Sequence, residues 1–215
     1  MATSVSLIIF DCDGVLVDSE GIAGRVLLDA MRDLGLSGTE EAVLDAFKGQ
    51  SMQACLALIS ARLGRQLPVD FERKLRADTA EAFRSGLRPI PGIETALDQI
   101  GLDYCVASSG PVEKIRLSLS LTGLLPRFEG RIFSAYEVRS WKPDPGLFLH
   151  AAAAMGVATE QTVVVEDSPV GVRAGRAAGM RVLGYGIGRE AQALAAEGAL
   201  VFGDMAGLPQ LIAGL

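Results

Sequence analysis

Residues 6–19 read Ser-Leu-Ile-Ile-Phe-Asp-Cys-Asp-Gly-Val-Leu-Val-Asp-Ser. The first five residues form a short, mainly apolar run, which is typical of a strand covered by helices on both faces. Asp11 and Asp13 follow this run directly. Ligands of open parallel sheets bind at the carboxyl ends of the strands, so the two carboxylates mark the edge where we expect a functional site.

Similar apolar runs recur along the chain, and helical patterns lie between most of them. Strand candidates are residues 104–107, 162–165 and 181–185, with weaker candidates at 131–133 and 200–202. This repeated strand–helix unit predicts an α/β fold with a Rossmann-like core, in which a parallel sheet carries helices on both faces.

The region between residues 20 and 88 differs because it contains no strand candidate. Four amphipathic stretches fill it, and each is followed by a glycine, as is typical of a helix end. The stretches are residues 21–34, 40–47, 52–63 and 70–85, followed by Gly35, Gly49, Gly64 and Gly86. We therefore predict a four-helix cap domain at residues 20–88. It would be inserted after the first strand of a catalytic core formed by residues 1–19 and 89–215.

Composition excludes several classes of protein. With 215 residues, 49% of them hydrophobic, the chain can bury a core without disulfides or a structural metal. The net charge of −6 disfavours nucleic acid as a partner, and the single histidine, His150, argues against a histidine-rich metal site or a Ser-His-Asp triad. Three cysteines without Cys-x-x-Cys spacing, no basic leader and no run of about 18 apolar residues predict a cytoplasmic protein with no membrane partner. We expect a monomer.

The two aspartates after the first strand are the first chemical signal. Asp11 and Asp13 repel each other unless a cation compensates them, so such a pair usually holds a divalent metal ion. An aspartate can also attack phosphorus while a neighbouring carboxylate transfers a proton. The alternative is a polar Asp-Gly turn that carries no chemistry.

Hydroxyl groups and a lysine follow other parts of the predicted sheet. Ser108 and Ser109 precede a helical pattern, where free N–H groups can bind an anion, although a serine could also only cap that helix. Lys142 lies in Trp-Lys-Pro-Asp-Pro, where two prolines fix the backbone and would hold the ammonium for a phosphoryl group. The alternative is a solvated lysine in a rigid loop.

A second pair of acids, Glu166 and Asp167, follows the strand predicted at 162–165. These carboxylates could complete a site for a hard cation with Asp11 and Asp13, while Asp167 or Ser168 could also cap the next helix. Because the groups follow different predicted strands, they should meet at one edge of the sheet. The sequence therefore predicts a Mg²⁺-assisted phosphoryl-transfer site.

These motifs, in this order, resemble those of the haloacid dehalogenase-like hydrolase superfamily. The insert resembles the helical cap of the subgroup that contains β-phosphoglucomutase and small sugar phosphatases. The resemblance implies that Asp11 is the nucleophile and forms an aspartyl-phosphate. Asp13 would protonate the leaving alcohol and then activate water, while Ser108 and Lys142 would hold the phosphoryl oxygens.

The resemblance also implies Mg²⁺ as the cofactor. Asp11 and the backbone carbonyl of Asp13 would bind the ion. Asp167 would be a further ligand, with Glu166 beside or behind it.

The chain departs from β-phosphoglucomutase at two cap positions. The mutase carries a histidine where this chain has Ala23, and an arginine where it has Met52. Both differences favour transfer of the phosphoryl group to water. We expect contacts with the substrate from four residues, namely Lys48, Gln50, Ser51 and Ser109.

We therefore expect a Mg²⁺-dependent phosphatase of small phosphorylated metabolites, such as the sugar-acid phosphate 6-phosphogluconate or a sugar phosphate. Two alternatives remain open. One is a phosphosugar mutase of the β-phosphoglucomutase type, and the other is a non-catalytic protein that binds a phosphometabolite. For Lys48, the alternative is a solvated helix end.

Overall fold

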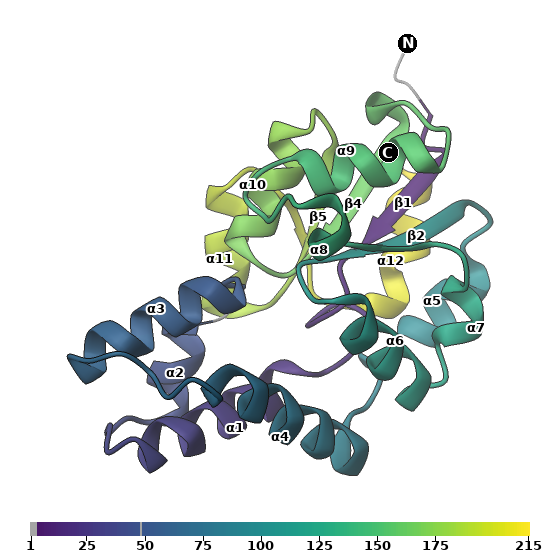
Figure 1. Cartoon of the computed structure of the whole chain (residues 1–215). Coiled ribbons are helices and arrows are strands. Elements are labelled where there is room, and N and C mark those ends of the chain that lie inside the picture. The colour runs from purple at the N-terminus through teal and green to yellow at the C-terminus, as the bar shows by residue number, and fades with distance from the viewer. Residues whose placement is uncertain (1–3, 48) are drawn as a thin grey trace.

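The computed structural model describes residues 4–47 and 49–215 and contains one six-stranded parallel sheet with the order β3-β2-β1-β4-β5-β6 (Figure 1). The strands are β1 (Leu7–Phe10), β2 (Asp103–Ser108), β3 (Ile132–Ser134), β4 (Thr162–Glu166), β5 (Arg181–Tyr185) and β6 (Leu200–Phe202). Each expected strand is present, including the two weaker ones. The expected α/β class with a parallel sheet is confirmed.

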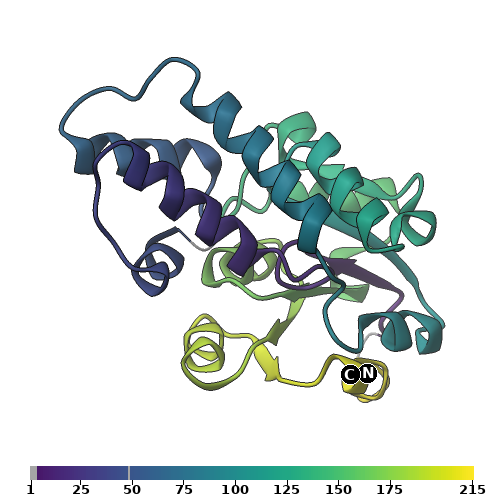
Figure 2. The ribbon, with the colours of Figure 1, turned by 90° about the horizontal axis from the view of Figure 1, so that it is seen from below.

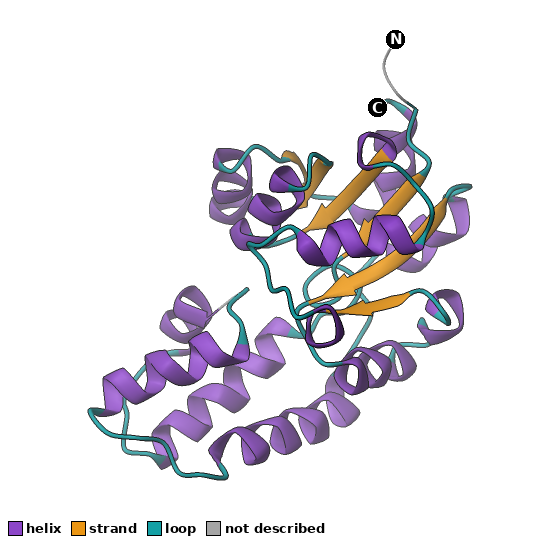
Figure 3. Cartoon of the chain, turned by 45° about the horizontal axis from the view of Figure 1, so that its top comes forward, coloured by secondary structure: helices purple, strands orange, loops and turns teal. Residues whose placement is uncertain are grey.

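Helices cover both faces of this sheet (Figure 3). Alternate residues of β1 are buried in different clusters: Ile8 and Phe10 face one layer, and Leu7 and Ile9 face the other. The first layer is formed by α5 (Ile93–Gln99), α6 (Val112–Leu121), α7 (Leu125–Phe128) and α12 (Leu208–Ala213). The second is formed by α8 (Ala135–Val138), α9 (Gly146–Ala154), α10 (Pro169–Ala177) and α11 (Gly188–Ala196). Double coverage explains why the strands are continuous apolar runs.

The first four helices after β1 are α1 (Glu20–Asp33), α2 (Glu40–Phe47), α3 (Met52–Leu63) and α4 (Phe71–Gly86), called the four-helix segment below. These helices bury a hydrophobic cluster of their own, which includes Leu27, Met31 and Ile59. The four expected helices are therefore confirmed, while the division into two domains stays a prediction. None of the helices in the described part of the chain is both long and apolar enough to span a bilayer.

The two segments of the chain that connect the four-helix segment to the sheet run side by side. The N–H of Asp18 donates to the carbonyl of Arg88 at 2.9 Å, and the N–H of Ile90 donates to the carbonyl of Leu16 at 3.0 Å. Beyond these connections, α4 lies beside α6 of the sheet layer (Figures 1 and 2). The four-helix segment is thus placed over the carboxyl end of β1.

Candidate active site

The residues predicted to carry chemistry meet at one edge of the sheet. Asp11 follows β1, Ser108 ends β2, and Glu166 ends β4. Between this edge and the four-helix segment lies a cavity of about 690 Å³. Of the predicted residues, Asp11, Asp13, Ser108, Ser109, Lys142 and Asp167 line the cavity.

Lys142 is the cation at the floor of this site. Its Nζ donates to Asp11 Oδ1 and to Glu166 Oε1, both at 2.6 Å, and to the carbonyl of Ala107 at 3.2 Å. The side chain is only 4% exposed, so the alternative of a solvated lysine is wrong. Burial disfavours the charge, but the carboxylates of Asp11 and Glu166 outweigh it and raise the pKa of Lys142, which keeps the ammonium charged.

Asp11 is a buried carboxylate among other carboxylates. Burial raises the pKa of Asp11 to about 7 against the opposing effect of Lys142, and Glu166 and Asp13 add to the rise. One ammonium therefore does not fully compensate the acids gathered here. Such a site favours the binding of additional positive charge.

Glu166 lies behind the cavity and is fully buried. Its Oε2 accepts hydrogen bonds from the N–H groups of Asp167 and Ser168, both at 3.1 Å, and from the Ser168 hydroxyl at 3.0 Å. Since Oε1 is bound to Lys142, both oxygens of Glu166 are engaged by this chain. A Cβ atom at Gly171 would lie 1.9 Å from this carboxyl group, so the start of α10 can lie here only with glycine at this position.

The donor atoms present suit a hard cation. Carboxylate oxygens of Asp11, Glu166 and Asp167 lie within 4.8 Å of one another, and all three residues are buried. Gly14 adopts a φ of +75°, and a Cβ atom there would lie 2.2 Å from Asp167 Oδ2. The glycine of the Asp-x-Asp-Gly motif thus lets the loop after β1 approach Asp167, and the resulting set of oxygens fits Mg²⁺.

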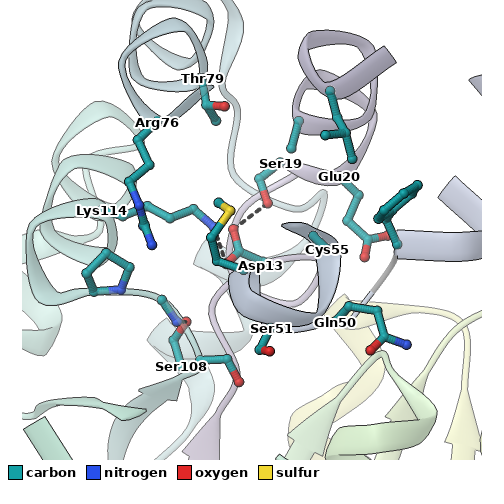
Figure 4. A pocket seen from close by; sticks show the side chains of 18 of the residues that line it. Asp13, Ser19, Glu20, Gln50, Ser51, Cys55, Arg76, Thr79, Ser108 and Lys114 are labelled. Atoms are coloured by element: carbon teal, nitrogen blue, oxygen red, sulfur yellow. Dashed lines mark hydrogen bonds and ion pairs between the residues drawn. The ribbon is translucent and has the colours of Figure 1, made fainter. Parts of the chain in front are cut away.

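The side chain of Asp13 is held by two residues that sequence reasoning did not select. Its Oδ1 accepts from the Ser19 hydroxyl at 2.6 Å, and its Oδ2 contacts Lys114 Nζ at 2.7 Å (Figure 4). Burial opposes ionisation, but Lys114 and Ser19 outweigh it and lower the pKa of Asp13. Ser19 precedes α1 yet makes no side-chain cap, because its hydroxyl is bonded to Asp13.

The two serine positions differ in their roles. Ser108 is buried, and its Oγ accepts from the N–H of Gly110 at 3.1 Å, so it does not cap α6. Ser168 does cap α10, because its Oγ accepts from the N–H of Gly171 at 3.1 Å. The capping alternative therefore holds for Ser168, while Asp167 beside it lines the cavity.

On the side of the four-helix segment, Gln50, Ser51, Ala23 and Met52 all line the cavity. Ser51 also caps α3, since its Oγ accepts from the N–H of Ala54 at 3.2 Å. Lys48, the remaining expected contact, lies outside the described residues. Sequence reasoning missed Arg76, which reaches the cavity from α4, because an arginine on an amphipathic helix has no distinguishing pattern.

Comparisons with known proteins agree with this geometry. The family of haloacid dehalogenase-like hydrolases matches residues 5–179. The chain is 37% identical to 6-phosphogluconate phosphatase of Escherichia coli K12 over 179 residues, which cover 83% of this chain and 81% of that protein. It is 32% identical to hexitol phosphatase B of the same organism over 178 residues, which cover 80% of each protein.

A solved structure supports the same conclusion. A haloacid dehalogenase-like protein of Agrobacterium tumefaciens C58 superimposes with a TM-score of 0.86 at 33% identity, covering 98% of this chain and 99% of that one. These comparisons confirm the expected fold, and they confirm a phosphatase as the class of enzyme. The chain belongs to the haloacid dehalogenase-like hydrolase family.

Proposed function

We propose that this phosphatase is Mg²⁺-dependent and hydrolyses small sugar or sugar-acid phosphates through an aspartyl-phosphate at Asp11. The observation that carries the proposal is the placement of Asp11 at the floor of the cavity, bonded to the buried Lys142, with Asp13 two residues away. The activities in the names of the relatives, on 6-phosphogluconate and on hexitol phosphates, support this substrate class.

In the first step, a carboxylate oxygen of Asp11 attacks phosphorus and the bond from phosphorus to the ester oxygen breaks. Asp13 reacts here in its protonated form, which the second step regenerates, and gives that proton to the departing alcohol. In the second step, Asp13 takes a proton from water, the water oxygen attacks phosphorus, and inorganic phosphate leaves Asp11. Ser108 and Lys142 hold the phosphoryl oxygens, where Lys142 compensates charge without having to move.

The metal would be held by oxygen atoms of the loop after β1 and of the segment after β4. Asp11, the backbone carbonyl of Asp13 and Asp167 are its ligands, with Glu166 beside or behind Asp167. When bound, Mg²⁺ neutralises negative charge on the phosphoryl oxygens. The engagement of both Glu166 oxygens by this chain supports a position behind the ligands.

The alcohol part of the substrate would extend toward the four-helix segment. Ser109, Gln50 and Ser51 line this part of the cavity and would contact it. Ala23 and Met52 line the cavity too, so the two positions at which this chain departs from the mutase face the substrate with apolar groups. This arrangement favours transfer to water over a mutase reaction. The net charge of −6 supports an enzyme without nucleic acid as partner, and cysteines without Cys-x-x-Cys spacing support a cytoplasmic one. The lack of a run of about 18 apolar residues supports the absence of a membrane partner, and we expect a monomer.

Release of inorganic phosphate from a panel of sugar, sugar-acid and polyol phosphates tests the proposal. Assays with Mg²⁺ and with EDTA are compared for the wild type, for Asp11→Asn and for Asp29→Asn, an exposed acid on α1. We expect hydrolysis only with Mg²⁺, its loss in Asp11→Asn and its retention in Asp29→Asn. Full activity of Asp11→Asn would refute the nucleophile, and conversion of a hexose 1-phosphate without phosphate release would establish the mutase.

A further inference from the structure

Two cationic side chains outside the reaction proposed above line one wall of the cavity. Arg76 comes from α4 and Lys114 from α6, and Figure 4 shows them as neighbours on the same side of Asp13. The side chains of Arg76 and Lys114 are 30% and 33% exposed, respectively. Partial burial makes their charges stronger binding groups than those of a solvated surface.

Arg76 is held in place yet keeps donors for a ligand. Its Nε and Nη2 donate to Glu72 Oε1 at 2.9 and 2.7 Å, and Nη2 also donates to the hydroxyl of Tyr136 at 2.7 Å. Nη1 donates to none of residues 4–47 and 49–215. The Tyr136 hydroxyl accepts from Arg76, so its own proton is available to an acceptor in the cavity.

Lys114 continues this row of donors toward the reacting groups. Its Nζ makes one ion pair, with Asp13 Oδ2 at 2.7 Å, and lies 5.9 Å from the centre of the Phe83 ring. An ammonium carries three N–H donors, so two remain beyond the bond to Asp13. The donors therefore extend from Asp13 to α4, along the part of the cavity that the leaving alcohol would occupy.

The opposite wall has a different character. Glu20 and Gln50 lie there, across the cavity from Arg76 (Figure 4). Arg84 also lines the cavity, but its side chain is 53% exposed and paired with Glu81 at 3.1 Å. Among the described residues that line the cavity, the partly buried cations other than Lys142 at its floor are thus Arg76 and Lys114, both on one wall.

We propose that Arg76, Tyr136 and Lys114 form a subsite for an anionic group at the far end of the leaving alcohol, either a carboxylate or a second phosphate. The planar guanidinium suits both, because it can present two parallel N–H donors to two oxygens. The inference rests on the proposed function and narrows it: the enzyme selects esters with a second anionic group over neutral polyol or sugar phosphates.

A matched pair of esters tests the subsite. In 6-phosphogluconate and glucitol 6-phosphate, only C1 differs, a carboxylate in the first and a CH₂OH group in the second. A hexose 1,6-bisphosphate forms the third arm. We expect the wild type to have a kcat/KM roughly tenfold or more higher for one or both anionic esters than for glucitol 6-phosphate. This is the factor that a hydrogen bond to a charged group typically contributes. Preference for 6-phosphogluconate identifies a carboxylate site, and preference for the bisphosphate identifies a second-phosphate site.

Variants then assign the preference to residues. We expect Arg76→Met to lower kcat/KM for the preferred anionic ester about 10- to 100-fold and to leave glucitol 6-phosphate within about threefold. Arg76→Lys should retain part of the preference, and Arg84→Met should retain all of it. If Arg76→Met does not fold, Tyr136→Phe removes one donor from the same subsite and should reduce the preference several-fold.

Equal kcat/KM of the wild type for all three esters, or an equal loss for all of them in Arg76→Met, would overturn the subsite while the proposed function stands. If no ester releases phosphate, the proposed function fails. In that case, calorimetric binding of the same esters to Asp11→Asn decides the subsite separately. Tighter binding of an anionic ester supports it, and equal affinity for the neutral ester overturns it.

Discussion

Lys114 and Asp13 are 101 residues apart in the chain, and Lys114 Nζ lies 2.7 Å from Asp13 Oδ2. Ser19 holds the other carboxylate oxygen at 2.6 Å. The orientation of the proposed acid and base is therefore set jointly by α6 and by the loop after β1. Lys114 is a positioning residue for Asp13.

Lys114→Met should slow the hydrolysis of esters whose leaving group must be protonated more than the hydrolysis of esters whose leaving group departs as an anion. Without Lys114, the Asp13 carboxylate loses one of its two orienting contacts, and proton transfer typically contributes about 10²–10⁴-fold to rate. We expect kcat for a sugar phosphate to fall at least roughly tenfold, while kcat for 4-nitrophenyl phosphate, whose leaving group is stable as an anion, changes less. Lys74→Met, at an exposed lysine of α4, is the control. Equal losses for both esters would contradict the positioning role.

Lys142→Met should destabilise the fold as well as abolish activity. The substitution leaves the buried carboxylates of Asp11 and Glu166 without their shared ammonium. Removing one partner of a buried ion pair costs about 3–5 kcal/mol. Urea unfolding measures this loss, and Arg116→Met, at an exposed pair with Glu129, should change the unfolding free energy little. An unchanged midpoint for Lys142→Met would show that the buried cluster contributes no stability.

Gly171→Ala should displace Glu166 and thereby disturb the active site. The added methyl group would lie 1.9 Å from the Glu166 carboxyl group, which must then move together with its bond to Lys142. Overpacking of this kind costs about 1–3 kcal/mol, and phosphate release should fall in parallel. Gly101→Ala, where the methyl group would meet no atom within 4 Å, should be neutral in both assays.

Mg²⁺ should stabilise the wild type against heat, because a ligand that binds only the folded state adds to its stability. At 100 times its Kd, the gain is about 2.7 kcal/mol. Asp167→Asn should remove most of this gain along with activity, whereas Asp33→Asn, at an exposed acid of α1, should keep it. Differential scanning calorimetry with Mg²⁺ and with EDTA measures the shift. An equal shift in Asp167→Asn would exclude Asp167 as a ligand.

The thiol of Cys55, which lines the cavity, should react slowly at neutral pH. Burial raises the pKa of Cys55 to about 11, so the thiol stays protonated below that pH and only a small fraction is the reactive thiolate. We expect its alkylation rate to rise about tenfold per pH unit between pH 7 and pH 10. Peptide mapping after timed treatment with iodoacetamide measures this rate, and bound phosphate ester should slow it. Fast modification at pH 7 would contradict the protonated thiol.

The sheet could be predicted from the sequence because its signal is local. Burial on both faces requires apolar residues at successive positions, so β1 and β4 are readable as continuous apolar runs. The helices of the four-helix segment were readable because amphipathic patterns end at glycines, such as Gly64 in the left-handed conformation after α3. The observed strands and the helices of the four-helix segment differ from the predicted ranges only at their ends, by one or two residues.

The acids and Lys142 were predictable because each follows a strand end, and parallel strands bring their carboxyl ends to one edge. Lys114 and Arg76 were not, since each contacts a partner on another element. Ser19 was not either, since its contact with Asp13 depends on how the loop after β1 folds back on itself. Whether Lys114 meets Asp13 depends on how α6 packs against the loop after β1, and whether Arg76 reaches Tyr136 depends on where α4 lies against α8.

The sequence by itself determined the order of strands and helices, the Asp-x-Asp-Gly loop and the set of groups available for phosphoryl transfer. Hydrophobic periodicity and the position of a residue after a strand depend only on residues close in sequence, so they can be read before the fold is known. The tertiary structure alone decided which donor faces which carboxylate, and which cationic side chains line the cavity. Most of those pairings join residues separated by tens to more than a hundred positions in the chain. They depend on how the elements pack, for which a single sequence holds no local signal.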